Sequence, residues 1–341
     1  MSRVAWSFVC LAGLVLTAGG CSKEIIITQY PEFYTDDMQG MSIAVAPFQN
    51  ATQDRTAGDV IADRLSSALD GNGTYKVYNS RYLKTLMDER NLQMAVAEDP
   101  MKAAEKFRQV KALNAHAILM GTVTTYAATQ RNERKQDPQY IYNPNTQRNE
   151  FAGYRVYTLT RNEANVTVTA TLVRLKDGAA IHTTDRPAQA QAWAQGSPPS
   201  MDPFACLTSA SENVVAQLVE EFAVVRKKIK VDPRKALRTA DELYDNKWTF
   251  AEKFAASDKE MFVVVELPAS CDRNRFRIVI VRRDAREPLA QEDIIWTRKY
   301  NSFGYKFNPS EIAGKGGGPG AYTVKFYSGP EPVFTRDFKI E

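Results

Sequence analysis

Asn165-Val166-Thr167-Val168-Thr169-Ala170-Thr171-Leu172-Val173-Arg174-Leu175 is the stretch that decides the fold of this chain. Its apolar residues stand mostly at alternate positions, with threonines between them. A period of two residues is typical of a strand that buries one face and exposes the other. Lys176-Asp177-Gly178 then predicts a hairpin turn, and Ala180 to Thr184 begins the return strand.

Strands and amphipathic helices alternate upstream of this hairpin. Apolar runs typical of strands lie at Ser42 to Phe48, Tyr75 to Tyr78 and Ala117 to Val123. Apolar residues recur at helical spacing in between. After the hairpin, Pro203 to Lys227 predicts one long helix with a continuous apolar face. The order predicts an α/β (α+β) domain in which helices flank a mixed sheet.

The last third of the chain has a different pattern. Val231-Asp232-Pro233 ends the first domain, and Arg234 to about Asp245 predicts a charged connecting helix. From Met261 onward, short apolar runs are separated by Gly, Pro and Asp turns. This spacing favours a small all-β domain, an immunoglobulin-like sandwich.

The N-terminus carries an export signal. Arg3 precedes an apolar segment, Val4 to Leu16, and small residues lead into Cys21. This layout is typical of a lipoprotein signal in which Cys21 becomes the lipidated first residue. The alternative is an ordinary cleaved signal that ends near a cysteine, because Ala18 stands where such signals usually have leucine.

The predicted organisation has five parts. They are a signal peptide over 1–20, a lipidated tether over 21–40, the α/β domain over 41–230, a helical linker over 231–258 and the sandwich over 259–341.

Charge and cysteine content narrow the function classes. The chain has 44 basic and 40 acidic side chains; loss of residues 1–20 removes only Arg3, so the mature net charge is +3. This balance does not indicate a nucleic-acid partner. Cys206 and Cys271 pair in an oxidising compartment or stay as two buried thiols.

The sequence offers no catalytic constellation, metal site or cofactor site. His116 and His182 are the only histidines, and we interpret His116 as a partly buried structural side chain. The acidic pair Glu220-Glu221 is typical of a solvated helix face. We therefore predict that the protein is not an enzyme.

Four segments together resemble the CsgG family of curli-secretion lipoproteins and the related LpoB-like activators of penicillin-binding proteins. They are Ser42 to Asn50, Ile61 to Leu65, Tyr75 to Arg81 and Ala115 to Val123. The resemblance spans about residues 40–225 and leaves 245–341 unmatched. It implies an anticodon-binding-like fold, acyl chains that anchor the protein to the outer membrane on the periplasmic face, and no catalysis.

The resemblance implies two alternative functions. In the CsgG branch, hairpins of a homo-oligomeric ring cross the membrane and secrete amyloid subunits. In the LpoB branch, the protein stays periplasmic and binds an enzyme that builds peptidoglycan. The segment where the first hairpin would lie, Tyr126 to Thr160, is rich in charge, and Asp185 to Pro203 holds four prolines. Charges cost about 2–4 kcal/mol each at a bilayer midplane, and prolines remove strand hydrogen bonds. We expect a scaffold or regulator that binds envelope proteins, with the secretion channel as the alternative.

Four tyrosines flank the charged insertion and are candidate partner-binding residues, because tyrosine is enriched at binding hot spots. The alternative is that they pack the insertion against its own sheet. They are Tyr140, Tyr142, Tyr154 and Tyr157.

Overall fold

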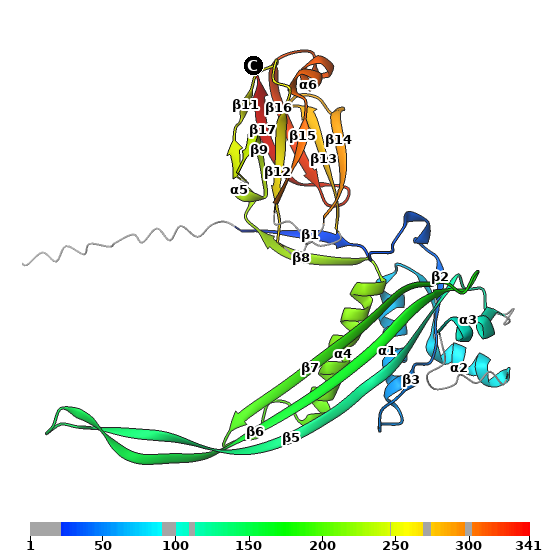
Figure 1. Ribbon diagram of the computed structural model, residues 1–341, viewed down its shortest axis with the longest axis vertical. Coiled ribbons are helices and arrows are strands. Elements are labelled where there is room, and N and C mark those ends of the chain that lie inside the picture. Colours follow the sequence, from blue (N-terminus) through cyan, green and yellow to red (C-terminus); the bar gives the residue numbers. More distant parts are fainter. Residues whose placement is uncertain (1–21, 91–99, 109–112, 246, 269–273, 297–301) are drawn as a thin grey trace, which may run out of the picture. The chain divides into compact units, whose positions relative to one another are not determined.

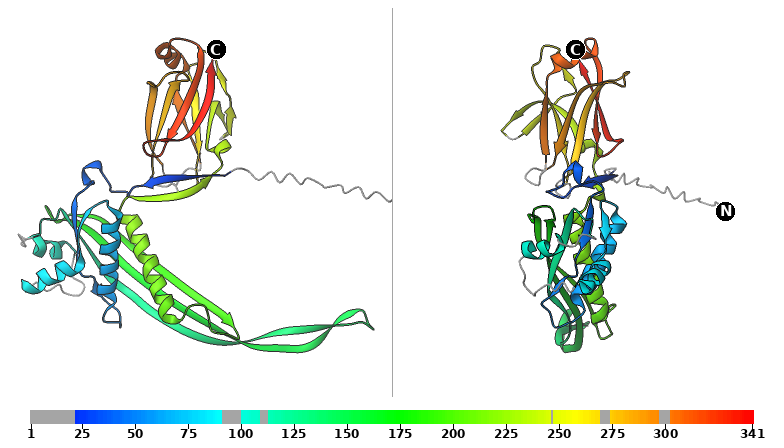
Figure 2. Two further views of the ribbon diagram at one scale, coloured as in Figure 1. Left: turned by 180° about the vertical axis from the view of Figure 1, so that it is seen from behind. Right: turned by 90° about the vertical axis from the view of Figure 1, so that its right-hand side faces the viewer.

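The computed structural model describes residues 22–90, 100–108, 113–245, 247–268, 274–296 and 302–341. The predicted signal peptide, Cys21 and Cys271 lie outside these ranges. The chain forms two compact units, Thr28–Arg226 and Met1–Ile27 with Lys227–Glu341. Figures 1 and 2 show both units, coloured along the sequence. In sequence, the first unit is an insertion into the second.

A mixed sheet forms the centre of the inserted unit, which confirms the predicted fold class. Its strands are β2 (Ser42–Val45), β3 (Gln49–Asn50), β4 (Lys76–Tyr78), β5 (Ala117–Asn143), β6 (Arg148–Arg174) and β7 (Ala180–Gln195). The order is β4-β2-β5-β6-β7, with β3 also paired to β5. β2 is parallel to β4 and β5, whereas β5, β6 and β7 are antiparallel neighbours.

Helices cover both faces of this sheet. α1 (Ala57–Asn72) and α4 (Pro203–Phe222) contribute to the larger core, and α2 (Ser80–Glu89) and α3 (Pro100–Arg108) to a smaller one. Neighbouring residues of β5 face opposite cores: Leu119 joins the larger core and Ile118 the smaller. A strand buried on both faces has a continuous apolar sequence, as the start of β5 does.

Strands β5, β6 and β7 are longer than the sequence predicts. The charged segment between Tyr126 and Thr160 is strand except for the turn that joins β5 to β6. Pro187 lies inside β7, opposite Thr167. The charge and the prolines that weigh against insertion in a membrane thus do not prevent these strands from forming. Pro187 is tolerated because β7 is an edge strand, so a missing N–H need not interrupt a ladder.

The second unit is a sandwich of two sheets, as predicted. One sheet has the order β10-β9-β12-β15 and the other β11-β17-β16-β13-β14. Their side chains share one core. Helix α6 (Pro309–Gly316) connects β15 to β16. The strands are β9 (Leu237–Tyr244), β10 (Lys247–Phe250), β11 (Lys253–Phe254), β12 (Met261–Glu266), β13 (Arg275–Arg282), β14 (Pro288–Ile295), β15 (Ser302–Phe307), β16 (Gly320–Tyr327) and β17 (Pro332–Ile340).

Two features of the sandwich are typical of the immunoglobulin-like arrangement that the sequence predicts. Neighbouring strands within the two sheets are antiparallel except β11, which runs parallel to the last strand, β17. Tyr322, near the start of β16, donates its hydroxyl hydrogen to the carbonyl of Gly318. A tyrosine at this corner that bonds to the backbone a few residues upstream is a hallmark of such domains.

The predicted linker and tether are wrong in part. The helix expected from Arg234 to Asp245 is limited to α5 (Pro233–Ala236), and β9 follows at once. Helix-forming residues become a strand there because Leu237 pairs with Val265 and is buried in the sandwich. Tertiary packing commonly overrides such weak local preferences.

The tether also contains regular structure. β1 (Lys23–Gln29) pairs with β8 (Val225–Val231) in a two-stranded sheet. Ile25 and Ile27 of β1 are buried in the core of the sandwich unit. The segment is therefore part of the folded protein from Lys23 onward, and a short 3-10 helix, η1 (Asp36–Met38), follows it.

Candidate functional site: an aromatic face on a projecting hairpin

The hairpin of β5 and β6 extends beyond the rest of its sheet. β7 ends at Gln195, opposite Leu159. From there to the turn, β5 and β6 have no further partner strand among the residues that the structure describes, and Figure 1 shows them leaving the sheet as a two-stranded ribbon. The left view of Figure 2 shows the same extension from behind. Both faces of this part of the hairpin are open to solvent.

A β-bulge sets which side chains share a face of the ribbon. Tyr140 pairs with Phe151, and Gln139 pairs with Gly153, so Ala152 is the extra residue. Gly153 has a φ of +120°, a conformation that only glycine adopts readily. Because of the bulge, Phe151 and Tyr154 project from the same face although they are three residues apart in sequence.

One face of the ribbon carries most of its aromatic side chains. Directly opposed residues point to the same side of a two-stranded sheet, so the register places one set together. We call the apolar members of this set the aromatic face; they are Pro138, Tyr140, Tyr142, Phe151, Tyr154 and Val156, and the polar residues Gln136 and Asn149 lie among them.

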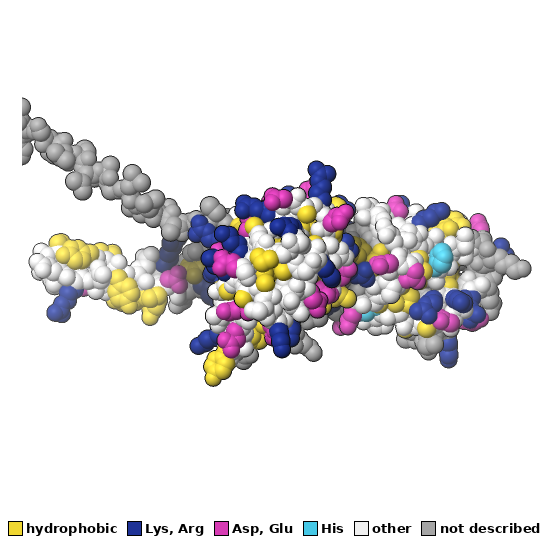
Figure 3. Space-filling model, turned by 90° about the horizontal axis from the view of Figure 1, so that it is seen from above, with side chains coloured by type: hydrophobic (Ala, Val, Ile, Leu, Met, Phe, Trp, Pro, Cys, Tyr) yellow, Lys and Arg dark blue, Asp and Glu magenta, His cyan; other side chains and the backbone are white. Residues whose placement is uncertain are grey.

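The rings of the aromatic face contact each other and remain exposed. The ring centroids of Tyr140 and Phe151 lie 6.0 Å apart, and those of Phe151 and Tyr154 lie 5.1 Å apart, both edge to face. Tyr140, Tyr142 and Tyr154 are about 60% exposed (61%, 59% and 63%). Figure 3 shows hydrophobic side chains gathered on the ribbon at the left of the view. Contiguous exposed apolar surface on a soluble protein commonly marks an interaction site.

The opposite face of the ribbon is polar. Lys135 Nζ lies 2.7 Å from Glu133 Oε2, and this hydrogen bond lowers the pKa of the Glu133 carboxyl. Tyr157 is on this face, opposite Lys135, and donates its hydroxyl hydrogen to Asp137. The pKa of Tyr157 is raised, mainly because the hydroxyl loses some hydration and also because of this hydrogen bond. The ribbon is therefore amphipathic, with Ile141 as the apolar exception on its polar face.

Side-chain hydrogen bonds organise the turn at the end of the ribbon. Asn143 and Thr146 both donate to Glu150 Oε1, at 2.9 and 2.8 Å. These two bonds lower the pKa of the Glu150 carboxyl. Asn145 N–H donates to Asn143 Oδ1 at 2.9 Å, and Gln147 has a φ of +53°. The turn thereby holds the aromatic strands on either side in register.

The structure brings three of the four predicted tyrosines together. Tyr140, Tyr142 and Tyr154 share the aromatic face, whereas Tyr157 lies on the other side. The ring contacts recorded for them are with Phe151 inside the ribbon. Sequence reasoning missed Phe151 and Val156 as members of this face. The Ala-Gly pair before Tyr154 is the one signal that could have indicated a bulge.

The described residues contain no cluster of three or more His, Cys, Asp or Glu side chains that could hold a metal ion. Cys206 is a free thiol buried in α4, and burial raises its pKa. His116 is exposed, contrary to expectation, and its Nδ1 accepts a hydrogen bond from Ser42 N–H at 3.2 Å.

Glu221 also differs from its expected position. It is 8% exposed rather than solvated, and its carboxylate lies against the Arg186 guanidinium at 2.5 Å and His182 Nε2 at 3.4 Å. The ion pair joins α4 to β7. The sequence could not show this because Arg186 and Glu221 are far apart in the chain and only the fold brings them together.

Among the described helices, none is both long and apolar enough to span a membrane.

No family model and no curated protein matches this chain. Among solved structures, lipoprotein GNA1162 from Neisseria meningitidis is similar at 17% identity and a TM-score of 0.31, over 52% of this chain and 98% of that one. The PelC dodecamer from Paraburkholderia phytofirmans is similar at 14% identity and a TM-score of 0.27, over 58% and 96%. The LpoB C-terminal domain from Escherichia coli is similar at 13% identity and a TM-score of 0.26, over 45% of this chain and 86% of that one. At this degree of similarity none of them assigns the chain to a family.

Proposed function

We propose that this chain is a lipid-anchored protein of the bacterial envelope that binds a protein partner and catalyses no reaction. Acyl chains on Cys21 hold it at the periplasmic face of the outer membrane, and the aromatic face of the hairpin is the binding surface. The observation that carries the proposal is the exposure of Tyr140, Tyr142 and Tyr154 on a ribbon that projects from its sheet.

The chemistry of the aromatic face favours a protein partner. Tyrosine and phenylalanine supply large rigid contact area at low entropic cost, which is why aromatic residues are enriched at the centres of interfaces. The polar opposite face keeps the ribbon soluble when the partner is absent. A ribbon with one apolar side can lie in a groove or across a flat surface, and its open edges offer backbone hydrogen bonds to a partner strand.

Site-specific photo-crosslinking in living cells tests the binding surface. A photoreactive phenylalanine analogue replaces Tyr142 in one strain and Ile141 in another; these neighbours lie on opposite faces of the same strand. We expect a crosslinked product of one defined size from position 142 and much less from position 141. Equal yields from both faces, or no product from either, would contradict the proposal.

A truncation of the rings sharpens the test. The triple variant Tyr140→Ser, Phe151→Ser, Tyr154→Ser removes the ring cluster, and each hot-spot aromatic is worth about 2 kcal/mol or more of binding free energy. The crosslink from position 142 should therefore disappear. The matched control is Gln139→Ser on the polar face, which should leave the crosslink unchanged.

The anchor is tested separately. Cys21→Ser removes the acyl acceptor, and the mature chain should then appear in the soluble periplasmic fraction. A single acyl chain binds membranes only reversibly, whereas two or three hold a protein stably. If the variant has lost its signal peptide and still stays in the membrane fraction after washing with high salt, the hairpin itself inserts into the membrane.

The one-sided apolar ribbon also supports a second candidate function, an oligomeric outer-membrane secretion channel. The edges of β5 and β6 beyond Leu159 have no partner strand among the described residues, so hairpins of several copies could pair side by side. The charges from Arg131 to Asp137 weigh against insertion in lipid. A detergent-stable ring that needs the hairpin would favour the channel, and a monomer or dimer would favour the scaffold.

A further inference from the structure

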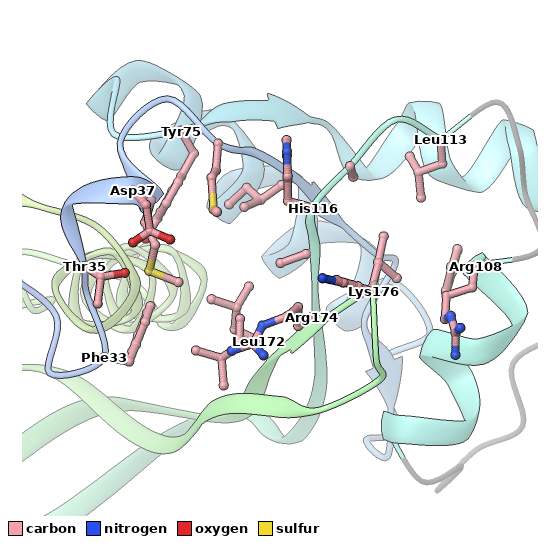
Figure 4. A pocket seen from close by; sticks show the side chains of 18 residues that line it. Phe33, Thr35, Asp37, Tyr75, Arg108, Leu113, His116, Leu172, Arg174 and Lys176 are labelled. Carbon is pink, nitrogen blue, oxygen red and sulfur yellow. The ribbon is translucent and has the colours of Figure 1, made fainter.

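A cavity of about 600 Å³ lies within the inserted unit, away from the ribbon. It opens at the end of the sheet where β2 and β5 begin and β6 ends (Figure 4). Pockets that bind small molecules commonly have volumes of about 300–1,000 Å³ and mostly apolar walls. The proposed partner-binding function does not use this cavity.

The walls of the cavity are largely apolar and belong to the cores of the unit. Ile43, Leu172 and Met38 are buried members of the larger core, and Phe107 and Leu113 belong to the smaller one. Tyr75 presents only its ring, because its hydroxyl donates to the Phe222 carbonyl at 2.8 Å. The site can therefore accept an apolar body but offers few polar groups along its walls.

Basic side chains stand at the cavity. Arg174 comes from the end of β6 and Lys176 from the turn after it. Figure 4 shows both side chains directed toward the side of the pocket where Phe33 and Asp37 lie. Arg174 Nη1 contacts Asp177 at 2.9 Å, which leaves its other N–H groups available. Lys176 has no ion pair or hydrogen bond to any residue that the structure describes.

The remaining charges of the lining are Arg108 and Asp37. Arg108 is bound by Glu105 at 2.6 Å on its own helix, and Figure 4 shows it at the far side of the pocket. Asp37, in η1, is the single acidic side chain among the described lining residues. The lining therefore has more positive than negative charge, and an anionic group is favoured near Lys176 and Arg174.

We propose that this cavity binds an amphipathic anion, a single alkyl or acyl chain that ends in a carboxylate or a phosphate. The chain lies on Ile43, Leu172 and Met38, and the head group accepts hydrogen bonds from Lys176 and Arg174. Free fatty acids and lysophospholipids share this chemistry. Asp37 disfavours the negative head group and so limits the affinity.

Titration calorimetry tests the proposal with the full mature chain carrying Cys21→Ser, so that neither attached acyl chains nor detergent compete. The probes are dodecanoate and dodecyl phosphate below their micelle concentrations, with dodecyltrimethylammonium and acetate as controls. We expect one anion per chain, and at least about tenfold weaker binding of the cation because it loses the charge-assisted hydrogen bonds. The tighter of the two anions identifies the natural head group as fatty acid or phosphate. Equal binding of anion and cation, or binding of neither, overturns the proposal.

Two substitutions in the lining should have effects of opposite sign, and a third outside it serves as a control. Lys176→Glu should weaken dodecanoate binding about tenfold or more, whereas Asp37→Asn should strengthen it. Lys76→Glu is the matched control, since Lys76 is an exposed lysine on β4 outside the lining. If Lys76→Glu weakens binding as much as Lys176→Glu does, the anion binds to the protein surface in general and the site is refuted.

A volume test separates the cavity from its charges. Ala115 lines the cavity and is only partly buried, so Ala115→Trp should fill the space while leaving Lys176 and Arg174 in place. The far-ultraviolet circular dichroism should be unchanged and dodecanoate binding lost. A folded variant that binds normally would show that the chain lies elsewhere and would overturn the proposal.

Discussion

The hairpin of β5 and β6 has two regions that differ in how far their side chains are exposed. The trunk packs beneath α4 and pairs with β7, whereas the tip is the ribbon beyond Leu159. In the trunk, Val166, Val168 and Ala170 of β6 are at most 1% exposed beneath α4. In the tip, Phe151 and Tyr154 of the same strand are 54% and 63% exposed. The pairing of β5 with β6 runs through both regions, interrupted by one bulge in each. Packing against helices, not strand pairing, therefore distinguishes the stable part of the hairpin from the part that is free to bind.

This difference has an energetic basis. A two-stranded ribbon is at best marginally stable by itself in water, so the trunk holds the tip in place. The open edges of the tip are protected from aggregation by charges such as Arg131, Glu133 and Lys135, which is a common device on exposed strands. The tip can therefore keep apolar rings in solvent without sharing in the stability of the core.

Hydrogen exchange should show the largest contrast between the two regions. Amides of Val166 to Leu172 should exchange only through global unfolding, whereas those of Tyr140 and Phe151 should exchange through local opening at nearly zero free-energy cost. For a domain of ordinary stability the difference is about 5 kcal/mol or more. Equal protection of trunk and tip would mean that something else stabilises the ribbon.

A core truncation should affect the trunk strongly. Leu119→Ala in β5 leaves a cavity at a fully buried position, and such changes lower the free energy of unfolding by about 2–5 kcal/mol. Tyr142→Ala on the same strand should change it by no more than about 0.5 kcal/mol. Urea unfolding followed by circular dichroism measures both. A large loss from Tyr142→Ala would contradict the division of the hairpin into two regions.

Removal of an ion pair should also destabilise the protein more in the trunk than in the tip, although by less than the core truncation does. Glu221→Gln removes the partner of Arg186 at a buried position of the trunk. Because the Arg186 side chain is 36% exposed, water compensates part of the loss, and we expect about 1–2 kcal/mol of destabilisation in urea unfolding. Lys135→Gln in the tip should leave the free energy of unfolding unchanged. A loss of stability as large as that of Glu221→Gln would contradict the difference between trunk and tip.

Acid should loosen the tip before the trunk. Hydrogen bonds from Asn143 and Thr146 hold the pKa of Glu150 below its usual value of 4.5. They stabilise the turn fully above that value and are lost as the pH falls through the lower pKa of the folded state. Nitrogen-15 relaxation from pH 6 to pH 3 should show the turn becoming mobile while β6 near Val168 stays rigid. In Glu150→Gln the pH dependence of this motion should disappear.

The sequence predicted the trunk better than the tip for a physical reason. A strand that is half buried must alternate, and the stretch from Asn165 to Leu175 does so. A ribbon with solvent on both faces need not alternate, so the charges from Arg131 to Asp137 resembled a loop. The aromatic face also depends on the bulge at Ala152. A shift of one residue in the pairing moves the side chains of a strand to the other face, so alternation in the sequence does not show which rings lie together.

Other differences arise from contacts between distant segments. β9 has residues typical of a helix, and its pairing with β10 and β12 makes it a strand. The cavity is formed by Phe33, His116 and Lys176 among others, which are far apart in sequence. No local sequence pattern predicts this cavity, because its lining residues become neighbours only when the chain folds.

The pairing of β1 with β8 has a consequence for the order of folding. β1 is made early in synthesis, yet its partner strand β8 follows only after about two hundred further residues. Ile25 and Ile27 therefore have no sandwich core to join while the inserted unit can already fold. The sandwich unit is completed last, so a chain interrupted before β8 would present an apolar strand without its partner.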